Sequence, residues 1–360
     1  MTVLYIVLVL VCAVALQFRR AERSLRHLIY QNDVDRELAE PDQVLTMTST
    51  LRNTGRLPVF YVNLLEPLPD QLRPEEDEAW QRKHLKASAF GPSCSEQLWL
   101  PPRRSRTRRF HFSLPKRGSY VLGKYYLTAG DYLGLHTWYR DGTEKRKVVV
   151  MPRRREDPGL ALTLGGYLGE ISVRRFLFED PVLTIGVRDY TGSEPFKQIA
   201  WKQTARTGKL QVKNYDYTVD ANVTILLNLD GGSPADRERC YEITRTVCEA
   251  LERRRIPYEF FSNGDLFGPQ GELKWFPEGL GSQHFRTLMY ALGQSRGVVY
   301  FSFSRMIERC LQSHRRSRGY IVISPPLRER DREALGKLCR ISDTEPCVLI
   351  AEAEEGGAAS

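Results

Sequence analysis

The sequence lacks the residue patterns of the common catalytic and metal-binding sites. Its seven cysteines include no pair at the CxxC spacing, and an odd number does not suit a disulfide framework. Its six histidines are scattered without the spacing of metal ligands. There is no G-x-S-x-G, no H-E-x-x-H and no phosphate loop with its lysine. We therefore expect a protein that is not an enzyme, that needs no cofactor, and whose cysteines are small buried side chains in a reducing compartment.

Long hydrophobic runs are also absent, except at the amino terminus. Residues 2–18 carry no charged side chain, and a run of roughly 17–25 such residues crosses a bilayer as a helix. Four arginines follow within the next eight residues, which by the positive-inside rule places the rest of the chain in the cytoplasm. A cleaved signal peptide is the alternative, favoured by Ala13-Val14-Ala15 but lacking a basic start. We predict a transmembrane helix at 1–18, and hence a single-pass protein of the cell membrane with cytoplasmic carboxyl-terminal domains.

The residue pattern divides the next part of the chain into three segments. The charged residues 19–35 are expected to continue the helix as a juxtamembrane stalk. From 36 to 152, short alternating or β-branched runs separated by turns predict a β-sandwich-like domain. In 153–195, repeated glycines break any long element and indicate a linker. With 360 residues the chain has room for two domains and an anchor.

Residues 196–351 alternate strand and helix patterns. The apolar run Val223–Leu229 stops at Asp230-Gly231-Gly232, which is typical of a strand buried on both faces. A helix is predicted from Pro234 to Arg255, with Ser233 as its cap. Other strands are expected at 256–262, 272–276, 320–324 and 347–351, and other helices at 282–292, 304–312 and 329–338. The pattern predicts an α/β fold with a mostly parallel sheet; residues 352–360 read as a disordered tail.

A long ordered motif links these elements to a known family. It reads Arg188-x-Tyr190-x-Gly192, then Ile199-x-Trp201-Lys202-x-Thr204-Ala205-Arg206, then the strand that ends in Asp230. The chain resembles the bacterial membrane-anchored proteins called domain of unknown function 58 (DUF58). The resemblance implies a von Willebrand factor A-like domain of Rossmann type after a β-rich part. It also implies two partners, a MoxR-type AAA+ ATPase and a transglutaminase-like membrane protein.

The metal site of von Willebrand A domains is expected to be degenerate in this chain. That site uses Asp-x-Ser-x-Ser after the first strand. Here Asp230 holds the first position, but Gly232 and Pro234 take the two serine positions, and Ser233 is out of register. One carboxylate with few hydroxyls does not hold Mg²⁺. We expect Asp230 instead to cap the following helix, or to bond to Arg206 or Trp201.

The strip from Arg188 to Lys213 has three interpretations: a structural clasp, which we favour, a partner-binding surface, or an active site. Arg188 and Arg206 suit a phosphate or carboxylate. No histidine, cysteine or paired carboxylate accompanies them at a useful spacing, which argues against catalysis.

The basic run at 103–109 contains five arginines without interleaved aromatic residues. Because single-stranded nucleic acid needs stacking rings, we expect a basic face near the inner leaflet and no nucleic-acid partner.

The patterns predict a membrane-anchored, non-enzymatic protein, and the resemblance implies that it is a scaffold or adaptor for protein–protein interaction that works with a MoxR-type ATPase. The alternatives are a metal-dependent adhesion module of the von Willebrand A type, and a hydrolase that uses the arginine-lined strip.

Overall fold

The structure is a computed structural model. It describes residues 26–75, 85–88, 91–130, 137–174, 184–215, 222–268, 271–272, 275–312, 319–342 and 344–352. The predicted transmembrane helix at 1–18 and all but the first residue of the predicted tail lie outside these ranges. None of the helices in the described ranges is long and apolar enough to cross a membrane. The chain divides into two compact units, Met1–Arg153 and Arg154–Ser360.

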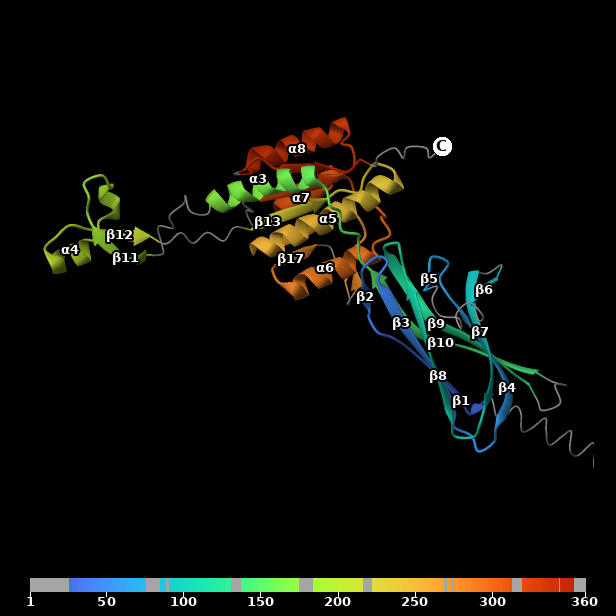
Figure 1. The fold of residues 1–360 in the computed structure, drawn as a ribbon. Helices are drawn as coiled ribbons and strands as arrows, with labels where there is room; N and C mark the ends of the chain where they lie inside the picture. The colour runs from blue at the N-terminus through green and yellow to red at the C-terminus, as the bar shows by residue number, and fades with distance from the viewer. Residues whose placement is uncertain are drawn as a thin grey trace, which may run out of the picture. The chain divides into compact units, whose positions relative to one another are not determined.

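The first unit is built from two β-sheets (Figure 1). Strand order is β1-β3-β8-β5 in one sheet and β2-β10-β9-β4-β7-β6 in the other. The strands are β1 (Leu28–Val34), β2 (Leu38–Ala39), β3 (Val44–Asn53), β4 (Val59–Pro67), β5 (Arg73–Pro74), β6 (Leu85–Ser88), β7 (Gly91–Leu100), β8 (Ser105–Ser113), β9 (Gly118–Gly130) and β10 (Thr137–Val150). Side chains from both sheets share the buried clusters, such as Met47 and Phe110 with Leu122 and Val148. The unit is therefore a sandwich, with its core between the sheets.

The predicted helical stalk at 19–35 is wrong in its described part, because β1 covers Leu28–Val34. Its side chains alternate between buried and exposed positions, with Leu28, Tyr30 and Asn32 inward. This period of two belongs to a strand with one buried face. β1 pairs with β3 along its whole length, from Leu28 opposite Asn53 to Val34 opposite Met47. The charges in this stretch occupy the outward positions, so its charge content alone was a poor guide to structure.

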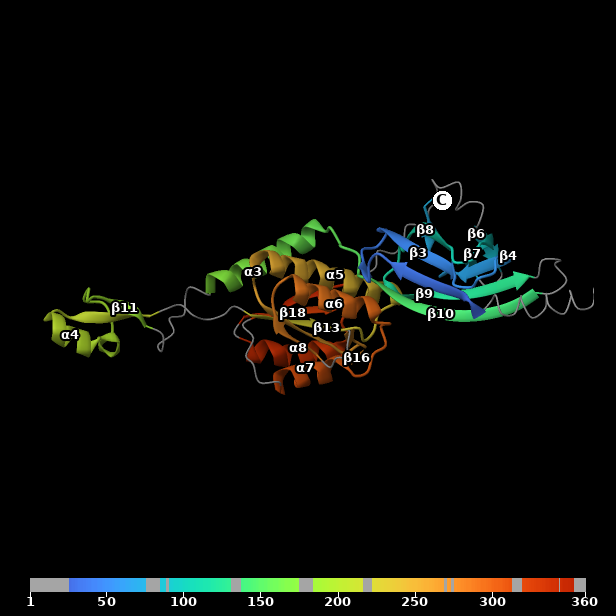
Figure 2. The same ribbon diagram turned by 90° about the horizontal axis from the view of Figure 1, so that it is seen from below.

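The second unit contains a five-stranded sheet in the order β17-β14-β13-β18-β19. The strands are β13 (Val223–Leu227), β14 (Tyr258–Ser262), β17 (Phe276–Gly279), β18 (Gly319–Ser324) and β19 (Cys347–Ile350). The helices of this unit that cover the sheet are α3 (Pro158–Arg174), α5 (Pro234–Arg254), α6 (Ser282–Gln294), α7 (Phe303–Gln312) and α8 (Glu329–Ile341). All strand pairs are parallel except β14–β17 at the edge. Figure 2 shows α3, α5 and α6 on one face of the sheet, and α7 and α8 on the other. The predicted α/β fold with a mostly parallel sheet is confirmed at this level.

Two boundaries in this unit differ from the sequence prediction. The expected linker contains α3, because Leu160, Leu164, Leu168 and Ile171 form one buried stripe at helical spacing. Each interior glycine costs a helix roughly 1 kcal/mol, and the buried stripe offsets that cost. The edge strand predicted at 272–276 is displaced: Gly271–Glu272 is β16, paired with β15 (Phe267–Gly268), and β17 begins at Phe276.

Residues 184–215 form a small piece with its own two-stranded sheet. It contains β11 (Thr184–Asp189), the 3-10 turn η1 (Phe196–Gln198), α4 (Trp201–Thr207) and β12 (Gln211–Tyr215). β11 pairs with β12 in antiparallel fashion. A domain boundary between 195 and 196 would separate these two paired strands, so the predicted boundary is misplaced. We call this piece the β11–β12 module.

Candidate functional site

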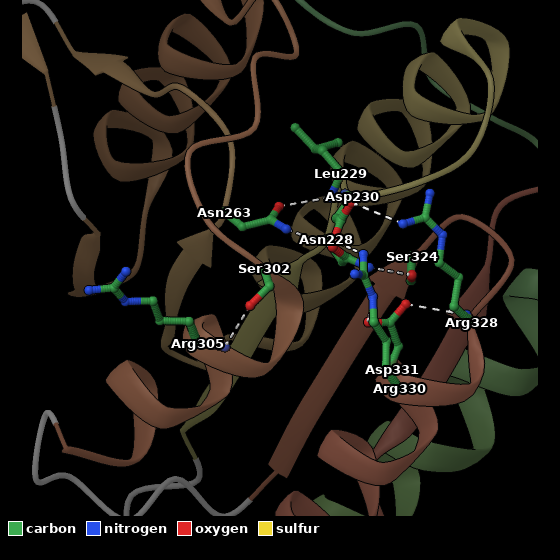
Figure 3. A network of polar contacts seen from close by, with 10 residues as sticks. All are labelled: Asn228, Leu229, Asp230, Asn263, Ser302, Arg305, Ser324, Arg328, Arg330 and Asp331. Carbon is green, nitrogen blue, oxygen red and sulfur yellow. Dashed lines mark hydrogen bonds and ion pairs between the residues drawn. The ribbon is translucent and has the colours of Figure 1, made fainter.

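The candidate site lies at the carboxyl edge of the parallel sheet, where three strand ends are tied together by buried polar side chains (Figure 3). Asn228 follows β13, and its Nδ2 donates to Ser324 Oγ at the end of β18 over 2.9 Å. Asn263, after β14, donates from Nδ2 to Asn228 Oδ1 over 2.7 Å and accepts the Leu229 backbone N–H over 2.8 Å. The three polar side chains are fully or almost fully buried. Their mutual bonds satisfy them and fix the backbone that leads into Asp230.

Asp230 is held by two arginines from the start of α8. Arg330 Nη2 donates to Asp230 Oδ2 over 2.9 Å, and Arg328 Nη1 lies 3.5 Å from Oδ1. The Asp230 side chain is 20% exposed, whereas those of Arg328 and Arg330 are 52% and 56% exposed. The acid therefore lies beneath two guanidinium groups that also face solvent. This edge of an open α/β sheet is where such folds place their ligands.

The turn after Asp230 is shaped by two glycines. Gly231 and Gly232 have φ of +88° and +66°, a region that favours glycine. A Cβ at Gly232 would lie 2.6 Å from Pro325 Cβ, so the position has no space for a side chain. The turn brings the chain to Ser233, whose Oγ accepts the Asp236 N–H over 3.1 Å, while Asp236 Oδ2 accepts the Ser233 N–H over 2.7 Å. This reciprocal pair is a capping box at the start of α5.

The predictions for this site are therefore confirmed in one part and wrong in another. Ser233 caps α5 as expected. Asp230 does not cap that helix, and its carboxylate bonds to Arg328 and Arg330 rather than to Arg206 or Trp201. The sequence contains a signal for this arrangement: Arg328 and Arg330 closely follow the strand that ends at Ser324, and carboxyl ends of parallel strands meet at one edge.

The chemistry of the site is that of an ion pair. The two serine positions of the metal-binding pattern are occupied by Gly232 and Pro234, and the Ser324 hydroxyl already accepts from Asn228. Within the described ranges, no group of three or more His, Cys, Asp or Glu side chains lies close enough together to hold a metal ion.

An exposed apolar loop is attached to the same edge. Tyr300 donates its backbone N–H to the Asn263 carbonyl over 2.9 Å, and Val299 pairs with Gly264. Asp265, which is buried, accepts from Ser295 Oγ and from two backbone N–H groups of the loop. These bonds hold Val298 and Tyr300 while leaving them 49% and 53% exposed. Exposed apolar side chains and exposed arginines at one edge of a sheet are typical of a protein-binding surface.

The remaining residues of the family motif lie in the β11–β12 module. Arg188 is paired with Glu194, and Tyr190 donates its backbone N–H to the Leu210 carbonyl over 3.0 Å. Gly192 has a φ of +98°. Trp201 is 63% exposed at the start of α4, and Arg206, on the same helix, is also exposed. The motif thus includes the pairing that clasps β11 to β12, while its arginines are not brought to Asp230.

The buried cysteines are poor nucleophiles because their surroundings disfavour the thiolate form. Five of the six described cysteines are buried, and Cys339 is exposed. Burial raises the pKa of Cys94 and of Cys310 to about 12. A thiol with such a pKa carries almost no thiolate at neutral pH, and the thiolate is the reactive form. The prediction of small buried side chains is confirmed for the five.

The basic run at 103–109 contains both exposed and buried arginine side chains. Arg103, Arg104, Arg106 and Arg109 are exposed. The Arg108 side chain is only 8% exposed, and it pairs with Glu66 and with Glu96 inside the sandwich. Tyr30 donates its hydroxyl to Glu66 in the same cluster. Arg108 therefore belongs to the interior and adds nothing to a basic surface.

Comparisons with known proteins show no family for this chain. No family model matches the sequence, and no curated protein matches it. Among solved structures, the CARDB domain of a Pyrococcus furiosus protein has a TM-score of 0.22 at 11% identity, covering 34% of this chain and 91% of that one. Spo0M, the sporulation control protein of Bacillus subtilis, has a TM-score of 0.20 at 10% identity, covering 46% and 58%. AvmM, which catalyses macrocyclization in alchivemycin A biosynthesis, has a TM-score of 0.24 at 11% identity, covering 36% and 91%. At these TM-scores the similarities support no statement about function.

Proposed function

We propose that this chain is a membrane-anchored, non-enzymatic scaffold that docks a partner protein at the carboxyl edge of its parallel sheet. The observation that carries the proposal is the neutralisation of Asp230 by Arg328 and Arg330, two side chains that remain more than half exposed. The carboxylate that would begin a metal site is already paired, and what faces solvent there is positive charge.

The arginine pair also indicates the chemistry of the partner. Guanidinium groups bind carboxylates with two parallel hydrogen bonds, so a partner's aspartate or glutamate can compete with Asp230 for them. Val298 and Tyr300 supply apolar area on the same edge. The surface fits an acidic segment that also carries apolar side chains.

We also propose that the chain is a member of the DUF58 family. A mostly parallel sheet with helices on both faces, and an aspartate just beyond the end of β13, is consistent with a von Willebrand A-like domain of the DUF58 proteins. The motif from Arg188 to Asp230 is what favours a MoxR-type AAA+ ATPase and a transglutaminase-like membrane protein as partners. Residues 2–18 are the proposed anchor.

The proposal is tested by crosslinking in cells from a photoreactive amino acid at Ser233, which is exposed beside Asp230. We expect one main protein adduct, identified by mass spectrometry as an AAA+ ATPase. Charge reversal of both arginines, Arg328→Glu with Arg330→Glu, should lower the adduct yield by roughly tenfold or more. Arg340→Glu is the matched control, because Arg340 is an exposed arginine at the other end of α8. An adduct that survives the double reversal, or a yield that falls equally in the control, would contradict docking at this edge.

Two further measurements separate the proposal from its alternatives. A metal-dependent adhesion module requires Mg²⁺ binding and exposure outside the cell, so a Mg²⁺ titration and protease access in intact cells test it. A hydrolase of the arginine-lined strip requires Arg188 and Arg206, so loss of cellular function in a folded variant with both replaced would favour it.

A further inference from the structure

The β11–β12 module carries an unbalanced surface charge. Its 32 residues contain six basic side chains and two acidic ones, a net charge of +4. All six basic residues are exposed: Arg188, Lys197, Lys202, Arg206, Lys209 and Lys213. Four of the six are lysines, whereas the carboxyl edge of the sheet uses arginines. The module therefore presents mobile ammonium groups rather than a fixed guanidinium pair.

Both acids of the module are occupied by neighbours within it. Glu194 accepts the Thr191 hydroxyl over 2.7 Å and the Thr191 backbone N–H over 3.1 Å, and it pairs with Arg188. The Thr191 hydroxyl bond, together with Arg188, holds the pKa of Glu194 at about 2. Asp189 accepts from the Gln211 side chain. Both acids therefore bind side-chain or backbone groups of the module itself, while the lysines are exposed to solvent.

Large apolar side chains are exposed among these lysines. Phe196 is 72% exposed and Trp201 is 63% exposed, and both are among the most exposed large hydrophobic residues in the described ranges. Their backbone is nevertheless well held. Ile199 pairs with Val212, and the Ala200 N–H donates to the Gln211 carbonyl over 2.8 Å. The small buried centre of the module, Ile199 with Val212, fixes the backbone between the two rings and leaves the rings exposed.

We propose that the β11–β12 module binds an anionic lipid surface, with Phe196 and Trp201 at the level of the headgroups and the lysines on their phosphates. Aromatic rings with basic neighbours are the combination that interfacial segments use, and each lysine or arginine near such a surface contributes on the order of 1 kcal/mol. Charge complementarity favours this occupant: the module is basic, and its only two acids are engaged internally. The inference stands on this module and does not depend on partner docking at Asp230.

The test uses the full chain reconstituted in vesicles, with p-benzoylphenylalanine in place of Phe196 as a photoreactive probe. The vesicles contain phosphatidylglycerol with phosphatidylcholine, or phosphatidylcholine alone. We expect a lipid adduct in the phosphatidylglycerol vesicles, at a yield at least about tenfold above that in phosphatidylcholine and reduced by high salt. An adduct with a second protein or within the chain itself, or an equal lipid yield in both vesicles, would overturn the proposal.

Charge variants complete the test. The triple reversal Lys197→Glu, Lys202→Glu and Lys209→Glu should remove the phosphatidylglycerol dependence without unfolding the module, since all three side chains are exposed. A matched triple reversal on α8, Arg332→Glu, Lys337→Glu and Arg340→Glu, keeps the net charge equal and should leave the lipid adduct unchanged. Circular dichroism of both variants checks that the fold is retained. Equal loss in both triples would mean that total charge, and not this module, sets the contact.

Discussion

Arg330 donates a 2.9 Å hydrogen bond to Asp230, a residue one hundred positions earlier in the chain. The bond connects the first turn of α8 to the loop after β13, across the carboxyl edge of the sheet. Arg328 approaches the other carboxylate oxygen at 3.5 Å. Asp230 thus binds the two arginines in the way that an acidic side chain of a partner would, and it competes with such a side chain for them.

Replacing Asp230 with asparagine should release the two arginines. Since both arginines are more than half exposed, we expect the loss in unfolding free energy to be about 1 kcal/mol or less. Binding of an acidic probe, a polyglutamate peptide, should tighten by several fold, because no internal carboxylate competes. Fluorescence titration with the labelled peptide measures this. Glu329→Gln is the control, an exposed neighbouring acid; equal tightening there would show a general charge effect.

Gly232→Ser should fail to create a metal site. It restores a hydroxyl at one serine position of the von Willebrand A pattern, but its Cβ would lie 2.6 Å from Pro325 Cβ. Gly232 also has a φ of +66°, which is strained for serine. We expect destabilisation of roughly 1–3 kcal/mol in thermal or urea unfolding, with no heat of Mg²⁺ binding in calorimetry. A Mg²⁺-stabilised variant would show that the arginines do not block the site.

The sequence was informative where one local pattern decided the structure. Val223–Leu229 and Pro234–Arg255 were placed to within two residues, because continuous burial, a proline at the first helical turn and a serine cap all agree. It was misleading where packing overrode a local signal, as in α3, whose glycines are offset by the stripe from Leu160 to Ile171. The partners of Asp230 depend on contacts between distant segments, and only the shared edge of a parallel sheet points to them.

Tyr167→Phe should loosen α3 from the sheet. The Tyr167 hydroxyl donates to the Tyr320 carbonyl over 3.0 Å and accepts the Tyr320 N–H over 2.9 Å, at the start of β18. Losing one hydroxyl leaves two buried backbone groups without this partner, at a cost of about 1–3 kcal/mol. Hydrogen exchange should show faster exchange at the Tyr320 amide, with α5 unaffected. Unchanged protection at Tyr320 would mean that α3 is not held through this hydroxyl.

His284 should make the second unit less stable in mild acid. Its ring packs against Tyr258 and Phe276, with centroids 4.8 Å and 4.7 Å away, and burial lowers its pKa below the ordinary value of 6.5. Because the unfolded chain then binds a proton at a higher pH than the folded one, the stabilising effect is present above pH 6.5. It is lost as the pH falls through the folded-state pKa. In urea unfolding, His284→Phe should reduce the loss of stability below pH 6.5. An identical pH profile in the variant would contradict a role for this ring.

The single variant Arg108→Met should destabilise the sandwich far more than replacement of any exposed arginine of the same run. Its loss leaves Glu66 and Glu96 buried without their shared cation, and breaking one side of such a buried pair costs roughly 3–5 kcal/mol. Arg106→Met on the same strand is the matched control, because Arg106 is exposed, and it should change stability by less than about 0.5 kcal/mol. The triple variant Glu66→Gln, Glu96→Gln and Arg108→Met removes the charges together and should recover most of the loss. Urea unfolding of the three variants decides the matter: if the triple variant is no more stable than Arg108→Met, lost packing rather than unpaired charge is the cause.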